Sequence, residues 1–91
     1  MTFNWDNAKN HVLKKERGIS FEEIVIAIEA GNTVDVLEHP NKNRYPDQIL
    51  ILVNVRDYIY VVPAVIDSNG FFMKTVFPSR KFTDQYLRKP G

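Results

Sequence analysis

The apolar residues recur at helical spacing in the first third of the chain and alternate with polar residues in much of the remainder. Asp6 is a suitable N-cap for a first helix that runs to about Arg17, and Gly18 fits the position just beyond its end. This helix is mostly polar, so only a narrow surface of it is expected to pack against the rest of the domain.

A second helix is predicted to begin at Ser20. The sequence Ser20-Phe21-Glu22-Glu23 is a capping box, in which the Ser20 hydroxyl and the Glu23 carboxylate accept hydrogen bonds from each other's backbone N–H groups. Apolar residues then follow at positions i, i+3, i+4 and i+7, which gives one stripe that faces the core. The stripe consists of Phe21, Ile24, Val25 and Ile28, and the helix is expected to end at Gly31-Asn32.

From residue 33 onward the pattern indicates strands. They are expected at residues 33–37, 48–54, 58–66 and 71–77. Ser68-Asn69-Gly70 supplies a hairpin turn, because Asn-Gly tolerates the positive φ that such turns need. Pro78 ends the last strand, and Ser79 is a suitable cap for a terminal helix that runs to about Leu87.

Two helices followed by a meander predict an α+β fold in a single domain that covers residues 1–91. The two N-terminal helices are expected to pack on one face of an antiparallel sheet of three to four strands, and a short C-terminal helix follows. Pro63 conflicts with a central position for its strand, because proline lacks the N–H that a ladder hydrogen bond requires. A bulge at Pro63 or an edge position for its strand would each remove the conflict.

Alternation along the last strand predicts which side chains share a face. One face receives Phe71, Met73, Thr75 and Phe77, and the other receives Phe72, Lys74 and Val76. If Met73 and Phe77 face the helices, Lys74 points to the open face of the sheet.

The composition is that of a soluble globular domain, with 44% apolar and 25% charged residues. No apolar run is long enough to span a membrane, and the N-terminus lacks the order of a signal peptide. The chain has no cysteine, and its two histidines, His11 and His39, do not belong to a metal-binding spacing. We therefore expect a cytoplasmic protein with no membrane contact, no metal and no cofactor.

Positive charge is concentrated at the C-terminal end. The chain as a whole carries a net charge of +1, whereas residues 74–91 carry five cations and one carboxylate. Such a segment is a possible footprint for phosphates or for an acidic protein, and it is also typical of an ordinary solvated tail.

Candidate chemistry therefore centres on the end of the last strand. Lys74, Arg80 and Lys81 are expected to gather at one corner of the sheet, where they would hold a phosphodiester and neutralise charge on its oxygens. Tyr58 and Tyr60 share one face of the neighbouring strand, where they would stack on bases or transfer protons. A solvent-facing lysine with tyrosines that cover a thin core accounts for the same pattern without a site.

The segment 39–47 adds two further candidates. His39 is a candidate for proton transfer, and Arg44 is a candidate for RNA contact. No G-x-S-x-G elbow, P-loop or Gly-rich dinucleotide turn is present in the sequence.

Two segments together resemble the BrnT-type toxins. The opening joins Phe3-Asn4-Trp5-Asp6-Asn7-Ala8-Lys9 to Gly18-Ile19-Ser20-Phe21-Glu22-Glu23, and is similar to that family's aromatic-x-Trp-Asp-x-x-Lys pattern with its Gly-aliphatic-Ser-Phe-Glu-Glu helix start. The stretch from Lys74 to Lys81 is similar to the family's closing basic strand, which is followed by Ser, a small residue, Arg and Lys. The order of the elements agrees over nearly the whole chain.

The resemblance implies a small toxin of a type II toxin–antitoxin pair with a RelE-like ribonuclease fold. Toxins of this kind cleave RNA without metal and are neutralised by a protein antitoxin, typically a DNA-binding protein of the ribbon-helix-helix type, with which a hetero-oligomer is expected. By resemblance, Lys74, Arg80 and Lys81 are the cations that face RNA.

Three functions stay open at this point. The first is an endoribonuclease that catalyses attack of a ribose 2′-OH on the adjacent phosphate, with Lys74 and Arg80 as electrostatic groups. The second is a non-catalytic protein- or RNA-binding module on the same scaffold, since no recognisable acid–base pair is present. The third is a structural subunit whose basic end docks on an acidic partner.

Overall fold

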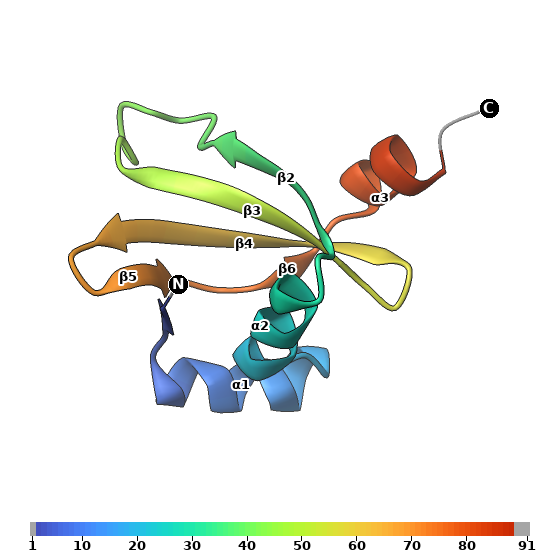
Figure 1. Cartoon of the computed structure of the whole chain (residues 1–91), viewed down its shortest axis with the longest axis horizontal. Coiled ribbons are helices and arrows are strands. Elements are labelled where there is room, and N and C mark those ends of the chain that lie inside the picture. Colours follow the sequence, from blue (N-terminus) through green and yellow to red (C-terminus); the bar gives the residue numbers. More distant parts are fainter. Residues whose placement is uncertain (1, 89–91) are drawn as a thin grey trace.

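The computed structural model describes residues 2–88 and shows an α+β fold with three helices and a six-stranded sheet (Figure 1). The elements follow in the order β1 (Phe3–Asn4), α1 (Asn7–Arg17), α2 (Phe21–Glu29), β2 (Thr33–Glu38), β3 (Gln48–Val55), β4 (Tyr58–Asp67), β5 (Gly70–Met73), β6 (Phe77–Pro78) and α3 (Arg80–Leu87). Among the described residues, no helix is both long and apolar enough to cross a membrane. The predicted fold class is confirmed, whereas the predicted three- to four-stranded sheet is too small.

The predicted starts of all three helices are confirmed. At each start a side-chain oxygen accepts a hydrogen bond from a backbone N–H of the first turn, and the capping residues are Asp6, Ser20 and Ser79. Gly18 follows α1 in the left-handed conformation, with a φ of 64°. The Glu23 carboxylate pairs with Arg56 of the β3–β4 turn, in place of the reciprocal bond of the predicted capping box.

The sheet is mixed and has the order β1-β5-β4-β3-β2, with β6 as a further partner of β4. The pairs from β2 to β5 are antiparallel as predicted, but β1 pairs with β5 in parallel and places Phe3 beside Phe71. Two residues are too few to show alternation, so the sequence pattern did not reveal β1. Gly70 allows this approach, because its φ is 112° and an added Cβ would lie 2.3 Å from the carbonyl oxygen of Thr2.

Pro63 lies in the centre of the sheet without disrupting it. The β3–β4 register continues through the pair of Leu50 and Pro63, so neither predicted solution, a bulge or an edge position for the whole strand, is needed. The Pro63 carbonyl accepts a hydrogen bond from the Lys74 N–H at 2.7 Å. The N–H and C=O of one residue in an antiparallel strand point to the same side. An N–H at position 63 would therefore face the gap between β5 and β6, so proline removes no ladder hydrogen bond there.

The predicted strand 71–77 is divided into β5 and β6, and this division changes the side-chain pattern. Met73 and Val76 both lie in the core beneath α1 and α2, although continuous alternation placed them on opposite faces. Phe77 pairs with Val61 and therefore points to the other face, away from Met73. The alternation prediction holds as far as Met73 and is wrong for Val76 and Phe77, because residues 74–76 are not part of a strand.

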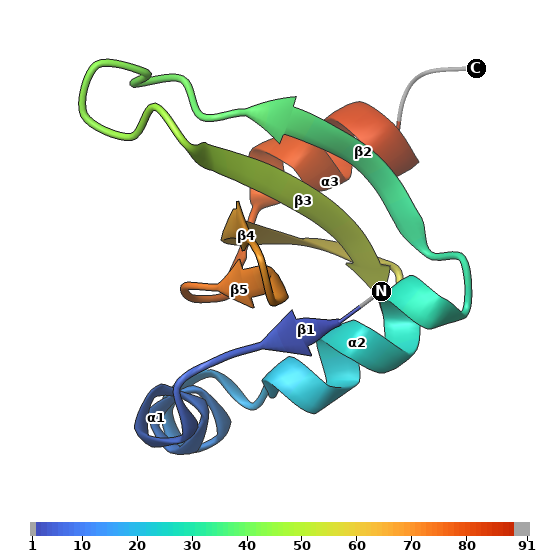
Figure 2. The same cartoon turned by 60° about the vertical axis from the view of Figure 1, so that its left-hand side comes forward.

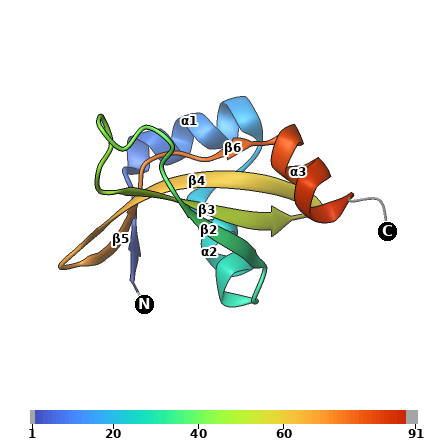
Figure 3. The same cartoon turned by 90° about the horizontal axis from the view of Figure 1, so that it is seen from above.

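The two faces of the sheet bury separate apolar clusters. On the α1–α2 face, helix residues such as Leu13 and Phe21 contact Ile51, Val53 and Val62 of the sheet. On the α3 face, the smaller cluster consists of Leu50, Leu52, Ile59 and Val61 with Leu37, Phe82, Tyr86 and Leu87. Figure 2 shows α1 and α2 below the strands and α3 on their other side, and Figure 3 shows α3 at the end of β4 away from β5. The single helix-covered face predicted from the sequence is thus correct for α1 and α2, and α3 covers part of the second face.

Candidate functional site

Three of the predicted candidates, Lys74, Arg80 and Lys81, contribute to a surface strip on the α3 face that begins at β5. Phe72 pairs with Val65, whose side chain alternates to the α3 face, and it is half-buried. The exposed Lys74 follows, and its Nζ lies 5.6 Å from the centroid of the Phe72 ring. A cation and an aromatic ring therefore lie side by side at the end of β5.

The strip continues along β6 to the first turn of α3. Phe77 is 37% exposed and points to the same face, because it pairs with Val61. Arg80 and Lys81 begin α3 and are both exposed, and the Lys81 Nζ lies 5.7 Å from the centroid of the Phe82 ring. We call the set of Phe72, Lys74, Phe77, Arg80 and Lys81 the basic–aromatic strip.

Hydrogen bonds to β4 fix the length of this strip. The Lys74 N–H donates to the Pro63 carbonyl, and the Ser79 N–H donates to the Ile59 carbonyl at 2.9 Å. Four residues of an extended strand span about 13 Å, so Lys74 and the start of α3 are separated by about that distance along β4. The cations thus share a face but follow a line. This arrangement matches an extended polyanion that runs past them better than it matches a single phosphate.

The cations of the strip are free of carboxylate partners within the described part of the chain. Other cations form ion pairs, namely Lys14–Glu22, Lys42–Glu38, Arg56–Glu23 and Arg88–Asp57. Among residues 2–88, no carboxylate oxygen lies within 4.0 Å of the charged nitrogens of Lys74, Arg80 or Lys81. Their charge is therefore available to an anionic ligand.

Tyr58 and Tyr60 lie together but not beside the strip. Their rings meet edge to face with centroids 6.1 Å apart, so the prediction that they share a face is confirmed. Tyr60 packs on the core of the α1–α2 face, opposite the basic–aromatic strip. Arg56 lies next to them, and its bond to the Glu23 carboxylate, with a smaller effect of Tyr60, raises the pKa of the Arg56 guanidinium above its ordinary value.

His39 and Arg44 belong to the loop between β2 and β3, which projects at the end of the sheet away from α3 (Figure 1). His39 Nδ1 accepts a hydrogen bond from the Asn41 N–H at 3.0 Å, and its ring lies 4.5 Å from that of Tyr45. The Arg44 guanidinium lies over the Tyr45 ring, 5.5 Å from its centroid. These two candidates form a local cluster of their own.

Residues 2–88, which the structure describes, contain no group of three or more His, Cys, Asp or Glu side chains placed to hold a metal ion. The chemistry that the strip offers is therefore cationic and aromatic, with guanidinium and ammonium donors for anionic oxygens and two rings for stacking.

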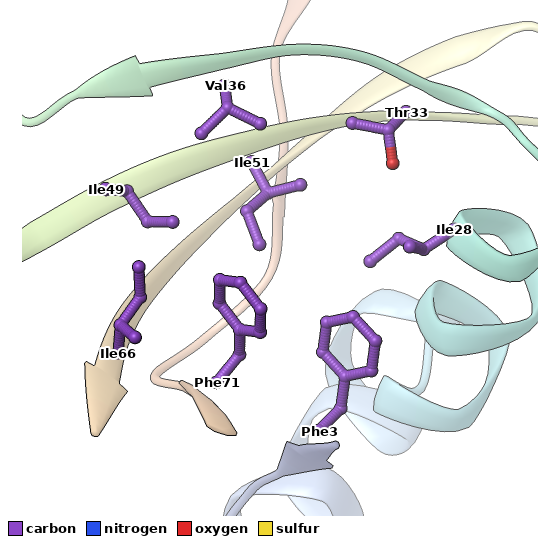
Figure 4. A pocket seen from close by; sticks show the side chains of 8 residues that line it. All are labelled: Phe3, Ile28, Thr33, Val36, Ile49, Ile51, Ile66 and Phe71. Atoms are coloured by element: carbon purple, nitrogen blue, oxygen red, sulfur yellow. The ribbon is translucent and has the colours of Figure 1, made fainter. Parts of the chain in front are cut away.

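An apolar groove on the α1–α2 face was not predicted from the sequence (Figure 4). It has a volume of about 340 Å³ and is lined by residues of α2 and of the strands β1 to β5. Its lining residues are Phe3, Ile28, Thr33, Val36, Ile49, Ile51, Ile66 and Phe71. Each lining residue belongs to the apolar stripe of a helix or to the apolar positions of a strand. The pairing of β1 with β5 brings Phe3 to the other lining residues, and no local sequence pattern predicts that pairing.

Comparisons of the chain with family models, with curated proteins and with solved structures find no match.

Proposed function

We propose that this chain is the toxin of a type II toxin–antitoxin pair and acts in the cytoplasm as a metal-independent endoribonuclease on single-stranded RNA. The observation that supports this proposal most is the basic–aromatic strip, which combines unpaired cations with exposed rings on one face. Proteins that bind single-stranded nucleic acid commonly combine these two groups, because cations follow the phosphates and rings stack on the bases. The resemblance of residues 3–23 to the opening of BrnT-type toxins supports the same proposal with residues outside the strip.

Within this proposal the strip has a defined chemical role. The ribose 2′-oxygen attacks the adjacent phosphorus, a new O–P bond forms, and the bond from phosphorus to the 5′-oxygen breaks. The products are a 2′,3′-cyclic phosphate and a 5′-hydroxyl, with one proton transferred from the attacking to the leaving oxygen. Lys74 and Arg80 hold successive phosphates along the strip, and the cation beside the reacting phosphate stabilises the negative charge that grows on its non-bridging oxygens. The candidates for proton transfer are Tyr58, Tyr60 and His39.

A second function is favoured by the location of those proton-transfer candidates. Tyr60 packs on the opposite face of the sheet, and His39 lies in the β2–β3 loop. A general acid or base must reach the reacting oxygens directly or through one water molecule. A non-catalytic RNA-binding module, whose strip holds RNA without cleaving it, is therefore the alternative.

The proposal is tested in cells and with purified protein. Inducible expression of the chain without its neighbouring reading frame should arrest growth and fragment RNA, and the purified chain should cleave single-stranded RNA in the presence of EDTA. A Lys74→Ala/Arg80→Ala variant should lose both effects, whereas a Lys9→Ala/Lys15→Ala variant, which removes the same charge from α1, should retain them. Normal growth and intact RNA with the wild-type chain would refute the toxin function, and RNA binding without cleavage would establish the alternative.

A further inference from the structure

The break between β5 and β6 determines how part of the basic–aromatic strip is presented. Residues 74–76 belong to no strand and lead directly into Phe77. Between the last pair of β5 with β4 and the first pair of β6 with β4, two residues of β4 lie opposite these three residues. An extra residue on one strand interrupts the ladder and redirects the side chains that follow it. The face to which Phe77 points therefore depends on the conformation of the break.

A hydrogen bond anchors each end of this break. At its start the Lys74 N–H donates to the Pro63 carbonyl at 2.7 Å. At its end the Arg17 guanidinium donates through Nη1 to the Val76 carbonyl at 2.6 Å, although the two residues are 59 positions apart in the sequence. The Val76 side chain is fully buried in the core of the α1–α2 face. Because its donor is charged, the bond from Arg17 is of the stronger kind.

The backbone of Arg17 has a fixed position. Arg17 is the last residue of α1, and Gly18 follows it in the left-handed conformation. Leu13, one turn earlier, and Ile19, two residues later, are both fully buried. The hydrogen bond therefore ties the break to a helix end whose place is set by the core.

The helix dipole does not account for this contact. Lys14, Lys15 and Arg17 all lie in the last turn of α1, where cations favour the negative end of the dipole. Lys14 pairs with Glu22, whereas within residues 2–88 no carboxylate oxygen lies within 4.0 Å of the charged nitrogens of Arg17. The Arg17 side chain instead reaches away from its own helix to a carbonyl of another segment.

The bond acts on Phe77 through a single peptide unit. The carbonyl of Val76 and the N–H of Phe77 belong to the same planar unit, in which they point in opposite directions. Arg17 holds this unit from the side of α1, and the pairing of Phe77 with Val61 holds it from the side of β4. With both sides held, the Phe77 side chain is directed to the α3 face.

We infer that Arg17 is a positioning residue of the basic–aromatic strip, which acts through Val76 to hold the Phe77 ring on the α3 face. Arg17 does not contact RNA in this role. The consequence for RNA binding rests on the proposed function, whereas the hold on the break does not. A residue of α1, on one face of the sheet, thus shapes the surface of the other face.

Hydrogen exchange of the full chain, followed by NMR for each amide, tests the hold on the break. Arg17→Met keeps an unbranched stem and a similar helix propensity but removes every donor. Exchange of the Phe77 amide should become at least about 10-fold faster, because loss of a hydrogen bond from a charged donor favours local opening. The amides of α2 should keep their wild-type rates. Lys15→Met is the matched control, since it removes the same charge from the same turn and should leave both regions unchanged.

The affinity for a labelled single-stranded RNA oligonucleotide, measured by fluorescence anisotropy, provides the second readout. Arg17→Met should weaken binding by up to about 10-fold, the loss expected when the ring itself is removed. The slope of log affinity against log salt should stay unchanged, because stacking of a ring on a base releases no counterions, whereas loss of a direct phosphate contact would make it shallower by about 0.7. In a Phe77→Ala background, Arg17→Met should cause no further loss, because Arg17 acts through the ring that is absent there.

The results that would overturn this inference differ from those that would refute the proposed function. Equal exchange of the Phe77 amide in the wild type and in Arg17→Met, or equal acceleration in α2, would show that Arg17 does not hold the break. A shallower salt slope, or additive losses in the double variant, would show that Arg17 acts on RNA without Phe77. If the wild-type chain binds no RNA, the proposed function fails together with the role of Arg17 in RNA binding, and the exchange of Phe77 still decides the hold on the break.

Discussion

The two faces of one sheet carry opposite kinds of surface. The α1–α2 face holds the larger core and ends in an apolar groove. The α3 face holds a smaller core and, beside it, cations without carboxylate partners among the described residues. Since alternate residues of a strand point to opposite faces, the same strands shape both surfaces. The comparison teaches that substitutions in the larger core can be separated from substitutions among the cations and rings of the other face.

The largest expected difference between the faces concerns two phenylalanines. Phe21 is fully buried and stacks on Trp5, so Phe21→Ala should lower the free energy of unfolding by about 3–5 kcal/mol. Phe77 is 37% exposed on the other face, so Phe77→Ala should change stability by less than about 1 kcal/mol. Urea denaturation of both variants measures this difference, and equal losses would contradict the division of the faces.

The same Phe77→Ala variant should lower the affinity for RNA and have little effect on the free energy of unfolding. Loss of one stacking ring typically costs about 1–3 kcal/mol per base, so the affinity for single-stranded RNA should fall by about 10-fold. Fluorescence anisotropy with a labelled oligonucleotide provides the measurement. Unchanged affinity would show that the Phe77 ring does not contact the RNA.

Attachment of α3 to the sheet depends on one buried hydroxyl. Thr83 is fully buried, and its Oγ1 accepts a hydrogen bond from the Ile59 N–H at 2.8 Å and donates to the Ser79 carbonyl at 2.7 Å. Thr83→Val keeps the shape but leaves the Ile59 N–H unpaired, whereas the Ser79 carbonyl still accepts a hydrogen bond from the Thr83 N–H. It should therefore lower stability by about 1–3 kcal/mol. Hydrogen exchange should show faster exchange in α3 than in α2, and uniform exchange would contradict the independence of the two clusters.

The local features of this fold were predictable from the sequence, and the long-range ones were not. Asp6, Gly18, Ser20 and Ser79 mark helix ends through bonds within a few residues, and each is found where the pattern placed it. The parallel pairing of β1 with β5 joins Phe3 to Phe71, which are 68 positions apart (71 − 3), and no period in the sequence reveals it. The apolar groove depends on that pairing and was missed with it.

The assignment of residues to the candidate site stays a prediction, and the structure changes their arrangement. Lys74 lies beside the Phe72 ring, and Arg80 and Lys81 begin α3, so the cations follow a line along β4 and do not gather at one corner. The break at residues 74–76, which accommodates Pro63, turned Phe77 to the same side and added a ring that alternation had assigned to the opposite face. Tyr60 was separated from the strip, because residue parity along β4 places it beneath the helices.

The smallest expected effects are opposite responses of the faces to pH. On the α1–α2 face the Asn10 amide donates to the Glu22 carboxylate at 2.7 Å and, with the helix backbone and Lys14, lowers the pKa of Glu22 below its ordinary value of 4.5. This stabilisation is complete above pH 4.5 and is lost as the pH falls through the lowered pKa. On the α3 face the hydrogen bond from the Tyr86 hydroxyl to Asp35, with burial, raises the pKa of Tyr86 above its ordinary value of 10.0.

The Tyr86 bond is therefore complete below pH 10.0 and is lost as the pH rises through the raised pKa. Thermal unfolding across the pH range should show that Glu22→Gln removes part of the acid sensitivity and leaves the alkaline limb unchanged. Tyr86→Phe should do the reverse. If either variant alters the acid and alkaline limbs of the stability profile equally, the Asn10–Glu22 and Tyr86–Asp35 hydrogen bonds do not act on separate faces.

The salt dependence of RNA binding tests most directly whether the basic–aromatic strip binds RNA. With three phosphate contacts, a plot of log affinity against log salt between about 50 and 200 mM should have a slope of about −2, since each contact to a single strand contributes about −0.7. Lys74→Ala/Arg80→Ala should reduce the slope to about −0.7, and Lys9→Ala/Lys15→Ala should leave it at about −2. A slope near zero for the wild-type chain, or equal slopes for both double variants, would contradict the assignment of RNA to this face.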